Sequence, residues 1–270
     1  MTEVVPYGAR DKGRAVRAMF DHIAPGYDVA NRMMSLGLDG GWRRAAARAA
    51  GLSAGDVALD VGTGTGDLAL ALAAAAPGAT VVGVDYAPAM LAAAPGKARR
   101  TDLAHRTQWA RADGHALPFA DESFDAVASA FVLRNLSDLP AAMADMARVL
   151  KPGGRLVALE ASPAASWPWS WVIDTHFRLV VPLLGATLAG DRTAYTYLGA
   201  SIAAFMAAEE FQRLMGDAGL APRPAIRLLR GAILIHRGLK PRRKGQRPDR
   251  PLTGRDAGEA VPVTPGGSSS

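Results

Sequence analysis

The sequence has no cysteine, few histidines and no long apolar run. Without cysteine, the chain of 270 residues forms no disulfide, no thiolate nucleophile and no cysteine metal site. Its five histidines do not follow the spacing of metal-binding motifs such as HExxH. No stretch approaches the roughly 20 apolar residues of a membrane-spanning helix, and the N-terminal stretch lacks the apolar core of a signal peptide. We therefore expect a cytoplasmic protein without a metal site.

Positive charge is concentrated near the carboxyl terminus. The formal net charge is +6; residues 239–270 contain seven Lys or Arg against three Asp or Glu, a net +4, which leaves +2 for residues 1–238. The same stretch has five prolines and no aromatic residue, a composition typical of disorder. We interpret residues 239–270 as a basic, disordered tail, either simply solvated or weakly attracted to anionic lipid or nucleic acid. A nucleic-acid substrate is disfavoured, because the charge lies mainly in this tail.

Short β-prone runs alternate with Ala- and Leu-rich helical patterns from about residue 55 onward. This rhythm predicts right-handed βαβ crossovers and a parallel sheet with helices on both faces. Two last β-prone runs, around Arg230-Gly231, predict a closing hairpin. The expected strands are 57–61, 80–84, 107–111, 124–129, 155–160, 226–229 and 232–236, and the expected helices are 67–76, 88–100 and 138–150.

The chain before residue 55 and the stretch between Glu160 and Pro222 have helical patterns. We divide the chain into an N-terminal helical segment (1–50), a main domain (51–238) with a helical insertion at about 161–221, and the tail. Three of the five tryptophans, Trp167, Trp169 and Trp171, fall in the insertion as WPWSW. Core packing is one interpretation of this aromatic stretch, and an apolar lid or a membrane-interface patch is the other.

A glycine-rich turn follows the first expected strand. The stretch DVGTGTGD runs from Asp60 to Asp67, and it lets a ligand approach the backbone where a Cβ would clash. Gly62 and Gly64 would give this backbone access, and Asp60 would orient the turn or face a cation. The third glycine comes too early for the dinucleotide fingerprint G-x-G-x-x-G. The turn therefore indicates a cofactor but disfavours a nicotinamide enzyme.

Acidic residues also end the next two expected strands. Asp85 lies where a carboxylate accepts hydrogen bonds from a ribose diol, and Asp113 lies where one accepts a hydrogen bond from an adenine amino group. Each acid alone is equally well explained as a helix cap or a turn residue. With Asp60 they form an ordered trio that would repel a pyrophosphate and tolerate a sulfonium cation. S-adenosylmethionine (SAM) fits this charge better than NAD.

The motifs resemble a known enzyme family. The sequence contains DVGTGTG, VVGVDYAPAML, ADGHALPFADESFDAV and RVLKPGG, which together resemble class I SAM-dependent methyltransferases. It also contains YDVANRMMSLGLDGGW, FVLRNLSD, RVLKPGGRLVALEAS and GDRTAYTYLGASIAAF, which are similar to the C-methyltransferases of ubiquinone and menaquinone biosynthesis. The resemblance covers about residues 14–240. It implies a Rossmann-like α/β fold with a mostly parallel seven-stranded sheet and a C-terminal antiparallel hairpin.

The resemblance also implies a reaction. A methyl group would pass from SAM to a ring carbon of a prenylated quinol, with demethylmenaquinol as the first choice of substrate. The family's cofactor contacts carry over to Thr65, Asp85, Asp113 and Gly114. The N-terminal segment would lie on the substrate side, and the insertion would offer an apolar groove to the isoprenoid tail. A homodimer and contact with the inner face of the cell membrane stay open.

Arg134 and Asn135, just past the fourth expected strand, are the best-placed polar pair for catalysis. Methylation of a ring carbon requires the neighbouring hydroxyl to become a phenolate, whose ordinary pKa is about 10. Arginine keeps its proton, so we assign oxyanion stabilisation to Arg134 and a hydrogen bond to the same hydroxyl to Asn135. The alternative for Arg134 is a surface ion pair with Asp138.

Tyr195 is the third predicted catalytic residue, as part of a lid or substrate wall. A lone tyrosine or histidine in an apolar segment is usually a packed, hydrogen-bonded group, so a structural role is the leading alternative for each candidate. The further candidates for the wall or for a general base are Tyr27, Tyr197, Asp28, His176 and His236.

The sequence departs from the family pattern at several positions, and other functions are open. Asp39 stands where the family usually has His, and Ala130 where it has Ser. A methyltransferase for another small hydrophobic or phenolic metabolite is the main alternative, and a non-catalytic SAM-binding protein is a lesser one. A peripheral membrane-binding role for WPWSW and the tail is compatible with the enzyme.

Overall fold

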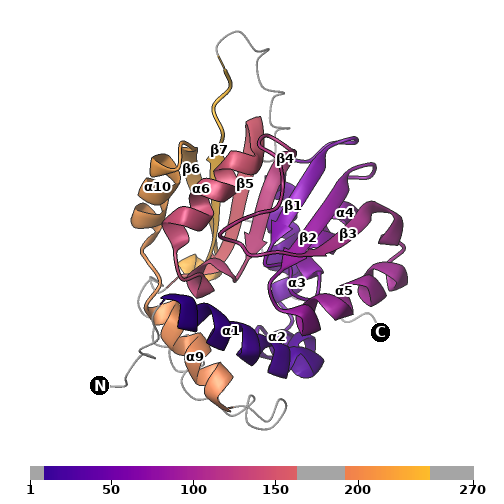
Figure 1. Cartoon of the computed structure of the whole chain (residues 1–270), viewed down its shortest axis with the longest axis vertical. Coiled ribbons are helices and arrows are strands. Elements are labelled where there is room, and N and C mark those ends of the chain that lie inside the picture. Colours follow the sequence, from indigo (N-terminus) through magenta and orange to yellow (C-terminus); the bar gives the residue numbers. More distant parts are fainter. Residues whose placement is uncertain (1–8, 163–191, 244–270) are drawn as a thin grey trace, which may run out of the picture.

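The computed structural model describes residues 9–162 and 192–243. These residues form seven strands and eight α-helices (Figure 1). The WPWSW stretch, His176 and most of the tail lie outside the described residues. The strands are β1 (Val57–Val61), β2 (Thr80–Asp85), β3 (Thr107–Arg111), β4 (Phe124–Ala130), β5 (Leu150–Ala161), β6 (Ala221–Leu228) and β7 (Ile233–Leu239). The helices are α1 (Ala9–Ile23), α2 (Tyr27–Met34), α3 (Asp39–Ala50), α4 (Asp67–Ala75), α5 (Pro88–Arg100), α6 (Leu139–Val149), α9 (Arg192–Ala203) and α10 (Ala208–Asp217).

All seven strands belong to one sheet, in the order β3-β2-β1-β4-β5-β7-β6. Strands β1 to β5 are parallel, and β7 runs antiparallel to both β5 and β6. The predicted α/β fold with a mostly parallel seven-stranded sheet and a C-terminal antiparallel hairpin is therefore confirmed. The strand order reverses beside β1, which is where open α/β sheets bind their ligands.

Alternating strand residues build a core on each face of the sheet. In β1, Ala58 packs in the core that contains α3 and α4, whereas Leu59 packs in the core that contains α6 and α10. Helix α3 is rich in alanine, begins at Asp39 and ends before Gly51, which adopts a left-handed φ of 58°. Burial on both faces explains why the central strands have continuous apolar sequences.

The C-terminal hairpin differs in extent from the sequence prediction. Strand β6 begins at Ala221 rather than at 226, although it contains Pro222 and Pro224. Proline is tolerated here because β6 is the last strand of the sheet, so one of its edges makes no ladder hydrogen bonds.

Helices α1, α2 and α9 lie together at one end of the sheet, at the bottom of Figure 1. Residues of α1 line a cavity together with the residues that end β1, β2 and β4, so α1 covers the carboxyl ends of these parallel strands. Within the described residues, no helix is long and apolar enough to cross a membrane.

Candidate functional site

The glycine-rich turn joins β1 to α4 and is held against β2. The backbone N–H groups of Gly62 and Thr63 both donate to Val84 O, at 2.9 Å. Gly62 has a φ of +69°, and a Cβ at this position would lie 2.3 Å from Cγ2 of Val132. Glycine is thus required at 62 both by backbone conformation and by space.

Asp60 lies buried beneath this turn. Its Oδ2 accepts a hydrogen bond of 2.7 Å from Thr63 Oγ1, whereas its Oδ1 has no partner among the described residues. Burial raises the pKa of Asp60 to about 7, although the Thr63 hydrogen bond opposes that shift. A buried carboxylate oxygen without a donor is unusual in a folded protein, and it fits a site that a cationic ligand completes.

Asp85 ends β2 and organises the neighbouring backbone. Its two carboxylate oxygens accept hydrogen bonds from Gly64 N, at 2.7 Å, and from Ala87 N, at 2.8 Å. Burial raises the pKa of Asp85, and these backbone bonds partly offset the effect. Each carboxylate oxygen has a further lone pair, so Asp85 can also accept from a ribose hydroxyl. Next to it, Tyr86 has the Arg17 guanidinium 5.3 Å from its ring centre.

Asp113 follows β3 and is half exposed. Its Oδ1 accepts from His115 N at 2.9 Å and lies 2.6 Å from His115 Nδ1. Burial alone would raise the pKa of Asp113, but the bonds and charge of His115 outweigh burial and hold this pKa below its usual value. The carboxylate is therefore available as an acceptor at neutral pH.

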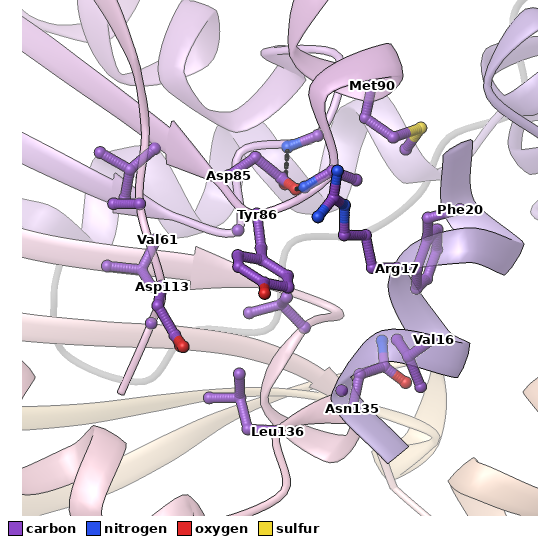
Figure 2. A pocket seen from close by; sticks show the side chains of 18 of the residues that line it. Val16, Arg17, Phe20, Val61, Asp85, Tyr86, Met90, Asp113, Asn135 and Leu136 are labelled. Carbon is purple, nitrogen blue, oxygen red and sulfur yellow. Dashed lines mark hydrogen bonds between the residues drawn. The ribbon is translucent and has the colours of Figure 1, made fainter. Parts of the chain in front are cut away.

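These strand ends and α1 enclose a cavity of about 360 Å³, here named the strand-end cavity (Figure 2). Figure 2 shows Asp85, Tyr86 and Asp113 on one side and Arg17 and Phe20 of α1 on the other. Five of the seven predicted cofactor residues line this cavity, and they are Gly62, Gly64, Asp85, Asp113 and Gly114.

The other two predicted cofactor residues, Asp60 and Thr65, lie behind the turn rather than in the cavity wall. Thr65 Oγ1 donates to Asp28 Oδ1 at 2.6 Å, and Lys97 Nζ donates to Asp28 Oδ2 at 2.7 Å. Lys97 also pairs with Asp67, the first residue of α4. Asp28 therefore ties α2 to the glycine-rich turn, which is a structural role rather than that of a free base.

A second, larger cavity of about 500 Å³ adjoins the first and is lined mainly by apolar side chains. We name it the apolar cavity. Its walls come from α1, α2, α3, α9 and the β6–β7 turn. The two cavities share four lining residues, Phe20, Tyr27, Phe131 and Asn135. Phe131 has a φ of 59°, which is rare for a bulky residue and is found most often at functional sites.

Arg134 lines the apolar cavity and makes a buried ion pair. Its Nη1 donates to Glu160 Oε2 at 2.9 Å, and its Nε donates to Ser201 Oγ at 3.3 Å. Glu160 Oε1 also accepts from Leu133 N at 2.8 Å. Burial raises the pKa of Glu160, and the Arg134 charge opposes this rise. The partner of Arg134 is therefore a buried glutamate of β5, and not Asp138, which caps α6.

Asn135 lies next to Arg134, at the junction of the two cavities. Tyr197 OH donates to its Oδ1 at 3.3 Å, so a tyrosine of α9 reaches this junction. Burial raises the pKa of Tyr197, which keeps the phenol protonated. Tyr195 lies in the same helix, but its side chain is outside the described residues.

His236 is placed far from this chemistry. It lies buried in β7 with its ring centre 4.3 Å from that of Phe211, and it lines neither cavity. Burial lowers the pKa of His236 to about 4. Of the candidate bases, Tyr27 and Tyr197 line the apolar cavity, whereas His236 and Asp28 are structural in this arrangement.

Sequence reasoning missed several wall residues. Arg14, Arg17 and Phe20 of α1 line the strand-end cavity, and Asp39 and Arg43 of α3 line the apolar cavity. No local motif marks the α1 residues, because the elements they pack against lie far away in the chain, and Asp39 was noted only as a departure from the family pattern.

The chain is similar in sequence to a known protein family and to several named relatives. The model of the ubiE/COQ5 methyltransferase family matches residues 8–240. A demethylmenaquinone methyltransferase of Deinococcus radiodurans is 46% identical over 214 residues, which are 79% of this chain and 88% of that protein. A demethylmenaquinone methyltransferase of Thermus thermophilus is 46% identical over 223 residues, which are 83% of this chain and 100% of that protein.

A solved structure shares the fold at lower sequence identity. The SAM-dependent methyltransferase of Thermotoga maritima aligns with a TM-score of 0.58 and 18% identity, over 83% of this chain and 98% of that chain. At this identity the similarity concerns the fold alone.

Proposed function

On the premise that this chain belongs to the ubiE/COQ5 methyltransferase family and is a SAM-dependent methyltransferase, we propose that it methylates a ring carbon of a prenylated quinol, with demethylmenaquinol as the substrate. The observation that carries the proposal is the shared wall of the two cavities. The strand-end cavity, which is lined by Asp85 and Asp113, adjoins a larger apolar cavity, and Asn135 stands where the two meet, next to Arg134 in the wall of the apolar cavity. A methyl donor and an apolar ring acceptor would thus be held next to each other.

The strand-end cavity suits SAM. The backbone at Gly62 and Gly64 would receive the methionine moiety, Asp85 the ribose diol, and Asp113 the adenine amino group. The unpaired Oδ1 of Asp60 supports an electrostatic or water-mediated interaction with the ammonium group. When bound, SAM supplies a methyl group that is activated by its sulfonium centre. Thr65 would act indirectly, by fixing the turn to Asp28.

The chain's own residues would prepare the acceptor ring. A ring carbon becomes nucleophilic as the adjacent hydroxyl loses its proton, so groups that stabilise the oxyanion lower the barrier. Arg134 holds a permanent positive charge within the apolar cavity, where low dielectric strengthens its effect. Asn135 would donate to the same oxygen through its Nδ2, while Tyr197 holds its Oδ1. The carbon–carbon bond would form as the carbon–sulfur bond of the donor breaks, which leaves neutral S-adenosylhomocysteine. The ring carbon would then lose its proton to solvent or to a neighbouring group, and the oxygen would regain a proton.

The mouth of the apolar cavity supports peripheral membrane contact as part of this proposal. Leu36 and Leu229 line the cavity and are 77% and 46% exposed, beside Arg230. Exposed leucines with an arginine form a surface that suits the interface of an anionic bilayer, in which a prenylated quinol resides. Cosedimentation with vesicles of neutral and anionic lipid, with and without residues 244–270, tests this contact. Equal soluble fractions in all samples would contradict it.

The decisive experiment is methyl transfer in vitro. Radiolabelled SAM is incubated with the purified chain and either reduced demethylmenaquinol or a demethylated ubiquinol precursor, and the product is extracted into organic solvent. We expect label in the quinol, with the naphthoquinol preferred. Absence of label from both acceptors, in a preparation that binds SAM by calorimetry, would contradict the proposal and favour another phenolic acceptor or a non-catalytic binding protein. Sedimentation velocity of the same preparation tests the homodimer.

A further inference from the structure

A second buried ion pair lines the apolar cavity, on α3. We propose that Asp39 and Arg43 recognise the second hydroxyl of the quinol, the one that is not adjacent to the methylated carbon. This inference rests on the proposed function and adds a specificity determinant to it. The substrate class that the pair would select is a 1,4-dihydroxy aromatic ring, as opposed to a ring with one hydroxyl.

The geometry of the pair is compact. Arg43 Nη1 donates to Asp39 Oδ2 at 2.6 Å, and Ser35 Oγ donates to Asp39 Oδ1 at 3.1 Å. The side chains of Arg43 and Asp39 are only 9% and 14% exposed, respectively, and both residues line the apolar cavity together with Ser35. Among the described residues, Asp39 is the one hydrogen-bond acceptor of the Arg43 guanidinium. A guanidinium has five N–H donors, so donors remain for a ligand in the cavity.

The pair and Arg134 lie near the same aromatic ring, that of Phe131. The guanidinium carbon of Arg43 lies 5.6 Å from the ring centre of Phe131, and that of Arg134 lies 5.9 Å from the same centre. Phe131 itself lines both cavities. The apolar cavity thus presents two guanidinium groups near Phe131, that of Arg134, which pairs with Glu160, and that of Arg43, which pairs with Asp39.

A quinol has polar groups that match this arrangement. Its two hydroxyls lie on opposite sides of the ring, and each is both a donor and an acceptor. An apolar cavity that satisfied one hydroxyl alone would leave the other unpaired, which lowers affinity by about 5- to 150-fold. When Arg134 and Asn135 bind one hydroxyl, Arg43 can donate a hydrogen bond to the other hydroxyl, and Asp39 can accept a hydrogen bond from it.

Helix stabilisation alone is a weaker explanation of the pair. Asp39 and Arg43 are four residues apart in α3, and such pairs occur on exposed helix surfaces. An exposed pair contributes little to stability, and burial of both charges adds a desolvation cost that packed apolar side chains would avoid. The adjacent Arg44 is exposed and would serve an ordinary surface role. A ligand that uses the buried charges explains why they face the cavity.

The test compares two acceptors and three proteins. The acceptors are the prenylated 1,4-naphthohydroquinone and a 3-prenyl-1-naphthol that lacks the second hydroxyl. The proteins are the wild type, the double variant D39L/R43M and the matched control R44M. The double variant removes both charges together, so that neither is left buried without a partner. Calorimetric SAM binding and thermal unfolding verify that each protein is folded.

We expect D39L/R43M to lower kcat/KM for the dihydroxy acceptor by about 5- to 150-fold, mainly through KM, with a much smaller change for the naphthol. Dividing the loss of kcat/KM for the dihydroxy acceptor by the loss for the naphthol removes the difference in intrinsic reactivity between the two acceptors. R44M should match the wild type with both. An equal loss for both acceptors, or no loss for either, would overturn the inference and assign the pair a structural role.

Failure of the proposed function has a different signature. A wild-type protein that binds SAM and methylates neither acceptor would refute quinol methylation, and this inference with it. A wild-type protein that methylates the quinol while D39L/R43M keeps full preference for it would refute the role of the pair alone. The single variant R43K adds a graded check, because a lysine keeps the charge and loses the planar set of donors.

Discussion

The strand-end cavity and the apolar cavity adjoin each other but are built in different ways. The first is made largely of strand ends and turns, and Asp85 holds the turn by hydrogen bonds to the backbone N–H of Gly64 and Ala87. The second is made largely of helices, and its charged groups are held by other side chains, as in the pair of Arg134 and Glu160.

This difference separates two kinds of site. A polar group fixed by the backbone keeps its place when a neighbouring side chain changes, because the fold itself positions it. A polar group fixed by another side chain depends on that one partner. We therefore expect the strand-end cavity to tolerate changes in helices α3 and α9, and the apolar cavity to respond strongly to single partners.

The largest expected effect concerns the side-chain-held arginine. The double variant R134M/E160Q should reduce kcat for the quinol by about 10²- to 10³-fold, because it removes the donor that stabilises the oxyanion. Glutamine keeps an acceptor for Leu133 N, and no charge stays buried alone. Steady-state kinetics measure the loss, and calorimetry should find SAM affinity nearly unchanged. R99M, at an exposed site in α5, is the control, and an unaltered kcat in R134M/E160Q would remove Arg134 from the mechanism.

A smaller effect is expected at the backbone-held carboxylate. Asp85→Ala should weaken SAM binding by roughly 1 to 3 kcal/mol, because it removes the acceptor for the ribose and leaves Gly64 N and Ala87 N without their partner. Isothermal titration calorimetry measures this change, and Asp217→Ala at an exposed helix end serves as the control. If SAM bound to Asp85→Ala as tightly as to the wild type, the cofactor would not lie in the strand-end cavity.

The pH dependence of cofactor binding should be smaller still. The pKa of Asp60 in the folded protein is about 7, above the ordinary value of 3.8, so the free enzyme holds a proton there below pH 7. Its contribution to stability is therefore present at low pH and is lost as the pH rises from about 4 to about 7. A cationic ligand favours the ionised form, so SAM affinity should rise with pH by up to about tenfold per unit and level off above pH 7.

Calorimetry between pH 5.5 and 7 in two buffers measures both the slope and the proton release. The variant Asp60→Asn should bind SAM with no such slope. A wild-type affinity that is flat over this range would mean that the cation does not interact with Asp60.

The smallest expected effect concerns His236, which lies outside both cavities. His236→Phe should leave methyl transfer unchanged, because the ring packs on Phe211 and touches neither ligand space. The pKa of His236 is about 4 in the folded protein and about 6.5 when unfolded, so its neutral form stabilises the fold above pH 6.5 and this contribution is lost as the pH falls toward 4. Thermal unfolding from pH 4 to 7 should show a weaker acid dependence in the variant. A large loss of kcat would restore His236 as a candidate base.

The sequence predicted the fold well because its strands are local features. Residues 57–61 and 107–111 were placed at the bounds that the structure gives to β1 and β3. The start of β6 was missed because prolines argue against a strand unless the strand is known to lie at an edge, and strand order is a property of the whole sheet.

The two cavities were not equally predictable. Gly62, Asp85 and Asp113 follow strands, and the carboxyl ends of parallel strands meet at one edge, so their convergence could be inferred. Glu160 was part of a quoted motif, but its contact with Arg134 joins residues 26 apart in the chain and depends on how β4 and β5 pair. The Asp39–Arg43 pair could be recognised as a helical pair, yet its burial depends on packing against Phe131.

The attachment of α2 to the glycine-rich turn through Asp28 has a kinetic consequence. Tyr27, the neighbour of Asp28, belongs to the wall that both cavities share, so the position of the turn affects the surface on which an acceptor binds. This coupling favours a compulsory order of association. We expect the methyl donor to bind before the quinol and S-adenosylhomocysteine to leave last, so this product should inhibit competitively against SAM and non-competitively against the quinol.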